Sequence, residues 1–142
     1  MRGYDGGKRV KGRKRHIAVD TLGFLLCVVV HAASISDSRG ARLLLLRLHG
    51  RFAGFAKIFV DGGYKKGCID WAAAMFGWPL EVVKRLGDGF QVLPKRWIVE
   101  RTFAWIVNDR LHARDYHHNP KHAEAAIYAT STRILLRRLA KM

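Results

Sequence analysis

The stretch Ile58-Phe59-Val60-Asp61-Gly62-Gly63-Tyr64 combines a short apolar segment, a carboxylate and two glycines. We expect a strand over Lys57 to Val60, with Asp61 at its carboxyl end. The glycines that follow let a phosphate or a metal ion come close to that carboxylate. An aspartate before two glycines is equally typical of a tight turn. The stretch therefore predicts a strand and one candidate metal ligand.

A second acidic candidate, Glu100, lies within Arg96-Trp97-Ile98-Val99-Glu100-Arg101. Pro94 suits the first turn of a helix, so we expect residues 95 to 107 to be helical. A spacing of four places Arg96 and Glu100 on one face, where they form an ion pair or, alternatively, Arg96 holds a phosphate while Glu100 holds a metal ion. Two-metal phosphodiester chemistry needs carboxylates from distant parts of a sequence. Asp61 and Glu100 fit if this helix packs beside the strand end.

The composition indicates one domain and a polyanionic partner. The chain has 142 residues, 49% of them hydrophobic, which is enough for a core. With 26 Lys and Arg against 11 Asp and Glu, the formal charge is +15, and nucleic acid is the commoner partner of so basic a protein. The apolar runs are shorter than a membrane span, and the two cysteines show no zinc or disulfide spacing. We expect a reducing, cytoplasmic setting.

Basic residues gather in the first fifteen positions, which we expect to form a solvated arm along a phosphate backbone. A merely solubilising tail is the alternative. Further arginines follow the predicted helix, where they could extend a phosphate track or simply form a solvated surface. The candidate DNA-binding residues are Lys11, Arg13, Lys14, Arg15, Arg96, Arg101, Arg110 and Arg114.

The first half of the chain predicts a hairpin followed by a helix. We expect strands over His16 to Val19 and Phe24 to His31, the second buried on both faces, with Asp20 to Gly23 as the turn. Ser36 or Asp37 can cap a helix over Ser38 to His49, which Gly50 ends. Its predicted apolar face consists of Leu43, Leu44, Leu46 and Leu48.

The second half predicts a helix over residues 65 to 76, a strand over Leu80 to Val83 and, after the helix that carries Glu100, a last helix over Lys121 to Ala140. The fold class is α/β. Four tryptophans occupy positions typical of a core: Trp71, Trp78, Trp97 and Trp105.

Several blocks together resemble the C-terminal part of a bacterial insertion-sequence DDE transposase of the insertion-sequence four/five superfamily. The resemblance covers nearly the whole chain and is carried by Gly3-Tyr4-Asp5-Gly6-Gly7-Lys8, Lys11-Gly12-Arg13-Lys14-Arg15-His16, Asp20-Thr21-Leu22-Gly23, Asp61-Gly62-Gly63-Tyr64 and Arg96-Trp97-Ile98-Val99-Glu100-Arg101-Thr102-Phe103-Ala104-Trp105.

The resemblance implies a ribonuclease H-like mixed sheet flanked by helices. It also implies an Asp-Asp-Glu triad with two Mg²⁺ or Mn²⁺ ions, which cuts double-stranded DNA at the element's ends and joins it to a target, in a homo-oligomer. Asp61 matches the second Asp and Glu100 the Glu. Arg96 matches the arginine one turn before that glutamate.

The first Asp of the triad has no matching block in this chain. Relatives carry it on a first strand upstream of Arg2-Gly3-Tyr4-Asp5, so we expect residues 1–142 to be one partial domain, from a decayed gene or a second reading frame, inactive alone. Two alternatives are a non-catalytic basic DNA-binding protein and a standalone nuclease in which Asp20 supplies the third carboxylate. The segment Asn108-Asp109-Arg110-Leu111-His112 departs from the arginine-rich pattern of relatives, so only Arg110 or Arg114 could provide the basic position expected there.

Overall fold

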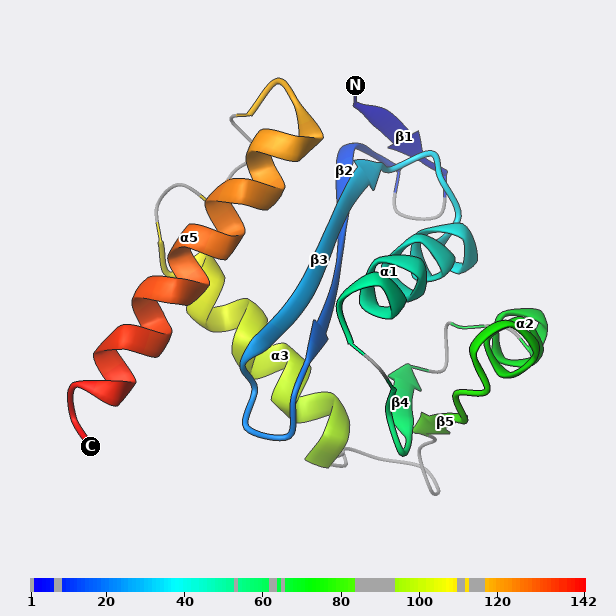
Figure 1. Ribbon diagram of the computed structural model, residues 1–142. Coiled ribbons are helices and arrows are strands. Elements are labelled where there is room, and N and C mark those ends of the chain that lie inside the picture. The colour runs from blue at the N-terminus through cyan, green and yellow to red at the C-terminus, as the bar shows by residue number, and fades with distance from the viewer. Residues whose placement is uncertain are drawn as a thin grey trace, which may run out of the picture.

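The computed structural model describes residues 2–6, 9–52, 54–61, 64, 66–83, 94–109, 112 and 117–142. Three strands come first, helices and strands alternate from α1 to α3, and a last helix follows, so the chain has a mixed α/β arrangement, which confirms the predicted class at that level (Figure 1). The elements are β1 (Gly3–Asp5), β2 (Val10–Val19), β3 (Leu25–Ala32), α1 (Asp37–Arg51), β4 (Ile58–Asp61), α2 (Lys66–Phe76), β5 (Leu80–Val83), α3 (Pro94–Val107) and α5 (Pro120–Leu139).

The described strands form two sheets, where the resemblance implied one mixed sheet. In the first sheet β2 lies between β1 and β3 and is antiparallel to both. In the second, β4 pairs in parallel with β5. The helix α2 connects β4 to β5, as parallel neighbours require a crossover between them. No ladder of hydrogen bonds joins the two sheets within the described residues.

The predicted hairpin turn is confirmed between β2 and β3. Asp20 Oδ1 accepts hydrogen bonds from the backbone N–H groups of Leu22 and Phe24, each at 2.9 Å. Gly23 has φ of +87°, a conformation that glycine adopts without a steric penalty. The side chain of Asp20 therefore has a structural role in closing the turn.

The strand β2 begins well before the predicted strand. It starts at Val10, so the basic residues expected in a solvated arm lie in a strand, and Gly3–Asp5 pairs with it as β1. That expectation was wrong in its local structure, because β2 pairs with β1 along Val10 to Gly12 and with β3 from Arg13 onward, which places the basic residues in a hydrogen-bonded strand. Arg15 and Ile17, for example, stand opposite Val30 and Val28 of β3.

The helix α1 starts as predicted and buries a different set of leucines. The side chain of Ser36 accepts a hydrogen bond from the N–H of Arg39 and caps the helix, which continues past Gly50 to Arg51. Leu43 and Leu46 are 41% and 46% exposed, so their assignment to the core was wrong. A helical spacing of three and four selects one stripe from the leucine run, and the buried residues are Ala41, Leu44, Leu45 and Leu48.

Both faces of β3 are buried, as its continuous apolar sequence predicts. Cys27 and Val29 face a core formed with α1, α2 and Trp78. Val28 and Val30 face a second core with Ile106 of α3 and Ile127 of α5. Figure 1 shows this layering, with α1 and α2 on one side of the β2–β3 sheet and α3 and α5 on the other. None of the described helices is long and apolar enough to cross a membrane.

Two of the four tryptophans predicted to lie in the core, Trp78 and Trp97, differ in their exposure. Trp78 is 3% exposed and belongs to the core, as predicted. Trp97 is 47% exposed, so its placement in the core was wrong. It lies in the first turns of α3, and the guanidinium of Arg101 lies 4.6 Å from its ring centroid. A cation over the ring supports it at the surface without burial.

Candidate active site

Asp61 is the last residue of β4, and its side chain is exposed. The N–H of Tyr64 donates to the backbone carbonyl of Asp61 at 3.1 Å, so the chain turns directly after the strand. Burial raises the pKa of Tyr64 to about 12, with the negative charge of Asp61 as the next cause. The negative charge of Asp61 therefore helps to keep this phenol protonated. Gly62 and Gly63 are outside the described residues.

Glu100 lies on the exposed face of α3, one turn after Arg96. The Arg96 Nε donates to Glu100 Oε1 at 3.0 Å, and both side chains are more than half exposed, at 51% and 59%. The prediction that Arg96 and Glu100 are neighbours on one face of the helix is confirmed. The exposed carboxylate leaves room for a second partner from solvent.

The helix that carries Glu100 packs beside the strand that carries Asp61. Ile98 and Val99 of α3 and Val60 of β4 line one cavity of about 340 Å³. Residues adjacent to each acid thus face the same space. This is the arrangement of elements that the sequence requires if Asp61 and Glu100 are to act together.

The third acidic candidate does not complete a metal site. Asp20 also lines the cavity, but its Oδ1 is occupied by two backbone N–H groups of the turn. Across the described part of the chain, which includes Asp20, Asp61 and Glu100, there is no group of three or more His, Cys, Asp or Glu side chains placed to hold a metal ion. The described residues alone therefore do not fit a site for two ions.

The predicted DNA-binding cations differ in how far their side chains are bonded within the fold. Three cations of β2 are partly buried and bonded within the fold: Arg13 donates to the carbonyls of His117 and His118, Lys14 pairs with Asp37 at 3.1 Å, and Arg15 donates to the carbonyl of His112 at 3.0 Å. Lys11 and Arg96 are exposed. Arg110 and Arg114 lie outside the described residues.

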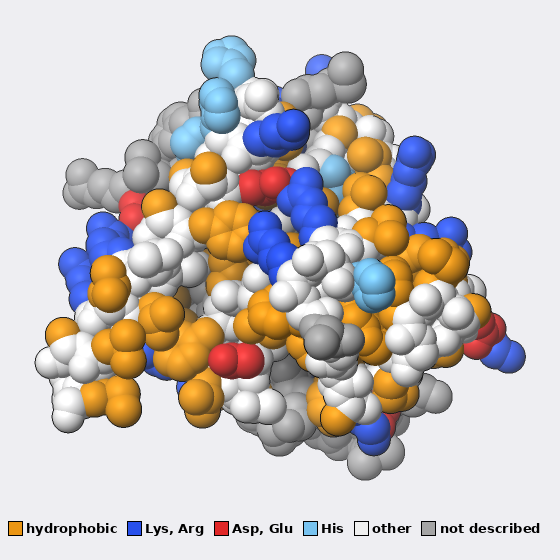
Figure 2. All heavy atoms as spheres, viewed as in Figure 1, with side chains coloured by type: hydrophobic (Ala, Val, Ile, Leu, Met, Phe, Trp, Pro, Cys, Tyr) orange, Lys and Arg blue, Asp and Glu red, His pale blue; other side chains and the backbone are white. Residues whose placement is uncertain are grey.

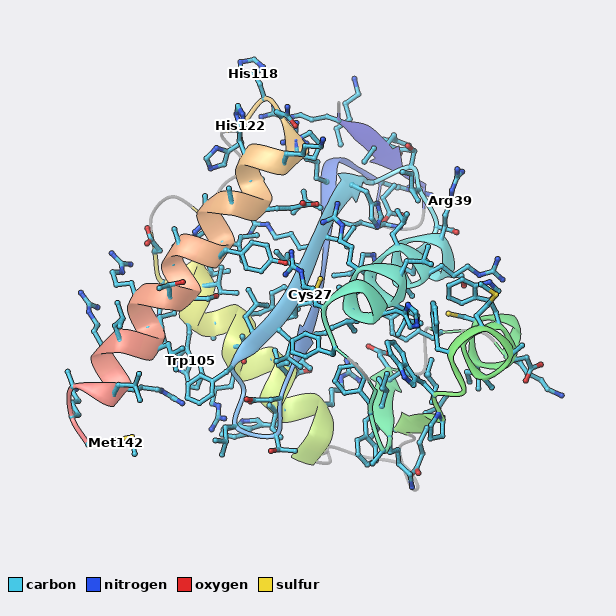
Figure 3. The ribbon with its side chains drawn as sticks, in the orientation of Figure 1. Cys27, Arg39, Trp105, His118, His122 and Met142 are labelled. Carbon is cyan, nitrogen blue, oxygen red and sulfur yellow. The ribbon has the colours of Figure 1, made fainter. Side chains whose placement is uncertain are left out.

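Arg101 belongs to a stack of aromatic rings and cations that the sequence prediction missed. Its guanidinium lies 4.6 Å from the ring centroids of both Trp97 and Trp105, and Arg138 of α5 lies 4.0 Å from Trp105. Trp105, labelled in Figure 3, thus joins α3 to α5. The spacing of four between Trp97, Arg101 and Trp105 was a signal in the sequence, whereas the contribution of Arg138 depends on tertiary packing.

The basic side chains are distributed over several elements. Figure 2 shows Lys and Arg on several parts of one face, interrupted by apolar and neutral surface. A distributed charge of this kind attracts a polyanion without defining a single groove.

The fold and the candidate acids define a basic α/β domain in which a strand-end Asp and a helical Glu lie on packed elements. Residues 1–136 match the family described as Transposase DDE domain, and the chain belongs to that family. No significant match was found among curated proteins or among solved structures.

Proposed function

We propose that this chain acts in DNA transposition, in the cleavage of DNA phosphodiester bonds at the ends of an insertion sequence and their transfer to target DNA. Membership of the Transposase DDE domain family and the net charge of +15 support a DNA substrate. The observation that carries the proposal is the packing of α3 beside β4, since it brings the elements of Glu100 and Asp61 to one cavity.

Asp61 and Glu100 are proposed as two members of an Asp-Asp-Glu triad in a ribonuclease H-like domain of the insertion-sequence four/five superfamily. Divalent ions, Mg²⁺ or Mn²⁺, would neutralise charge that develops on the scissile phosphate. The third carboxylate has to come from outside the described residues. The chain is proposed to bind DNA and to cleave it only when that third carboxylate is in place.

Arg96 is proposed to bind a phosphate next to the reacting group. Its ion pair with Glu100 is exposed and worth only a few tenths of a kcal/mol, so a DNA phosphate can replace the carboxylate as its partner at little cost. Lys11 of β2 is also exposed and is proposed to add a contact to the DNA backbone that does not depend on base sequence.

The test is a plasmid-nicking assay on the 142-residue chain in Mg²⁺ and in Mn²⁺, paired with DNA binding measured by fluorescence anisotropy. We expect salt-sensitive binding and at most slow nicking. Asp61→Asn and Glu100→Gln should abolish any nicking and leave the fold intact. Asp70→Asn, which changes an exposed carboxylate on α2, is the matched control and should have no effect.

Two results would overturn parts of this proposal. Robust nicking that survives Asp20→Ala and disappears in Asp61→Asn would show that the described acids need no third partner. Nicking that is equal in all the variants would remove Asp61 and Glu100 from the reaction and favour a purely DNA-binding role.

A further inference from the structure

The strand β3 lies at one edge of its sheet in the part of the chain that the structure describes. It pairs with β2 on one side, and no other described strand pairs with it. Its first six residues, Leu25-Leu26-Cys27-Val28-Val29-Val30, are apolar, with no charge and no proline. Segments of this kind pair with copies of themselves when their backbone groups are open to another chain. The outer edge of β3 is therefore a place where two chains could join.

Side chains from two helices occupy the backbone groups of this edge. The N–H of Val28 donates to the hydroxyl of Tyr128 at 3.0 Å. The N–H of Val30 donates to Glu124 Oε1 at 2.9 Å. The guanidinium of Arg47 donates to the carbonyl of Val28 at 3.0 Å. Because alternate residues of a strand point their backbone groups to the same side, these are the groups that a further strand would use.

The side chains at the edge also bond to one another, in two pairs that each join α1 to α5. Arg47 Nη1 lies 2.7 Å from Glu124 Oε2. Arg51 Nη1 donates to the Tyr128 hydroxyl at 2.7 Å, and its guanidinium lies 5.0 Å from the centroid of that ring. Figure 1 shows β3 between α5 and α1, so that side chains from both helices reach its edge. We name these four side chains the edge cover: Arg47, Arg51, Glu124 and Tyr128.

We propose that the edge cover keeps β3 from pairing with the β3 edge of a second copy of this chain. Two identical edges can pair antiparallel about a two-fold axis, so a single segment supplies both sides of the contact. The edge cover satisfies the backbone groups of β3 and offers no continuous ladder of its own to a second chain. A second strand can reach the edge only after both side-chain pairs are broken. The inference concerns association between chains, and it holds whatever reaction the protein carries out.

The test is to open the edge and to measure self-association by sedimentation velocity over a range of protein concentrations. Arg47→Met combined with Tyr128→Phe removes the partners of both backbone groups of Val28. We expect this variant to self-associate about tenfold or more strongly than the wild type, because several backbone hydrogen bonds form between the two edges. If it does not fold, Arg51→Met combined with Tyr128→Phe opens the same N–H and keeps the Arg47–Glu124 pair.

The matched control is Lys57→Met, which also removes one positive charge from an ion pair, in this case an exposed one with Glu81. It should self-associate like the wild type. Amide hydrogen exchange locates the contact. In the opened variant, the Val28 amide should exchange about tenfold or more faster than in the wild type at low protein concentration, and it should be protected again at high concentration.

Three outcomes would overturn the inference. An opened variant that associates no more strongly than the wild type would mean that the edge recruits no second chain. Stronger association with protection that returns only outside β3 would place the contact elsewhere. An equal gain in Lys57→Met would mean that the lower net charge, and not the open edge, causes the association.

Discussion

Arg96 and Glu100 face each other across one turn of α3, with 3.0 Å between Nε and Oε1, on a surface where both side chains are more than half exposed. Such a pair contributes little to stability, so each residue can exchange its partner for another ligand at little cost. We propose that each residue has a ligand of its own: a phosphate for Arg96 and a metal ion for Glu100.

Arg96→Ala should lower the free energy of unfolding by less than about 0.5 kcal/mol, because exposed pairs at this spacing are worth only a few tenths. The same change should weaken DNA binding several-fold and reduce the dependence of that binding on salt, which anisotropy titrations at several salt concentrations measure. Lys57→Ala removes one partner of another exposed pair, Lys57 with Glu81 at 2.8 Å. A loss of affinity that is equal in the two variants would mean that Arg96 acts only through net charge.

Glu124 links α5 to β3 and should be important for stability. It is 8% exposed, accepts from the N–H of Val30 at 2.9 Å and pairs with Arg47 at 2.7 Å. Glu124→Ala should cost about 3 kcal/mol, since it leaves a buried N–H and a partly buried guanidinium without their acceptor. Glu81→Ala, at the exposed pair with Lys57, should cost less than about 0.5 kcal/mol. Urea denaturation measures both, and equal losses would contradict the importance of burial.

His16 should make the folded state sensitive to acid. Burial, and next the charge of the stacked His31, lower its pKa to about 4 from 6.5. The unfolded chain therefore takes up a proton between these values that the folded chain does not, so stability present above pH 6.5 is lost as the pH falls toward 4. The loss approaches about 3 kcal/mol, at about 1.4 kcal/mol per pH unit.

An NMR titration of the His16 ring measures its pKa directly. His16→Asn should flatten the stability profile between pH 6.5 and 4 relative to the wild type. A ring that titrates at its ordinary pKa would contradict the buried placement.

Gly40 allows the paired histidines to pack against α1. A Cβ at this position would collide with His31 Nε2 and lie 2.5 Å from His16 Nε2, inside any real contact distance. Gly40→Ala should therefore destabilise the chain by about 1 to 3 kcal/mol. Gly67→Ala on α2, where a Cβ meets nothing within 4 Å, should stabilise it by about 0.5 to 1 kcal/mol. Thermal unfolding checks the two signs, and a neutral Gly40→Ala would show that the histidines can move.

Local signals in the sequence predicted most of the elements. The Ser36 cap, the Asp20 turn and the apolar run of β3 depend on neighbouring residues, and the structure has all three. The start of β2 was missed because its basic side chains hide the strand pattern. The core leucines of α1 were assigned wrongly because a continuous run of leucines does not show which side of the helix faces the core. The packing of other elements on the helix decides it.

The candidate site was predictable only in part. The residue types and spacing marked Asp61, Glu100 and Arg96, and the helix spacing predicted the contact of the last two. The packing of α3 beside β4 depends on tertiary contacts, as does the stacking of Arg138 on Trp105. The separation of the described strands into two sheets is likewise a property of the fold that no single segment encodes.

The proposed triad implies that Asp61 and Glu100 ligate the same divalent ion, and Mn²⁺ affinity in a double-mutant cycle, read by electron paramagnetic resonance in the presence of a short DNA duplex, measures whether they do. We predict that Asp61→Asn and Glu100→Gln each weaken Mn²⁺ binding by about tenfold or more, and that the double variant is little weaker than either single one, as expected for two ligands of one ion. Asp70→Asn should bind like the wild type. Additive effects of the two changes, or an affinity that neither change lowers, would contradict a shared site.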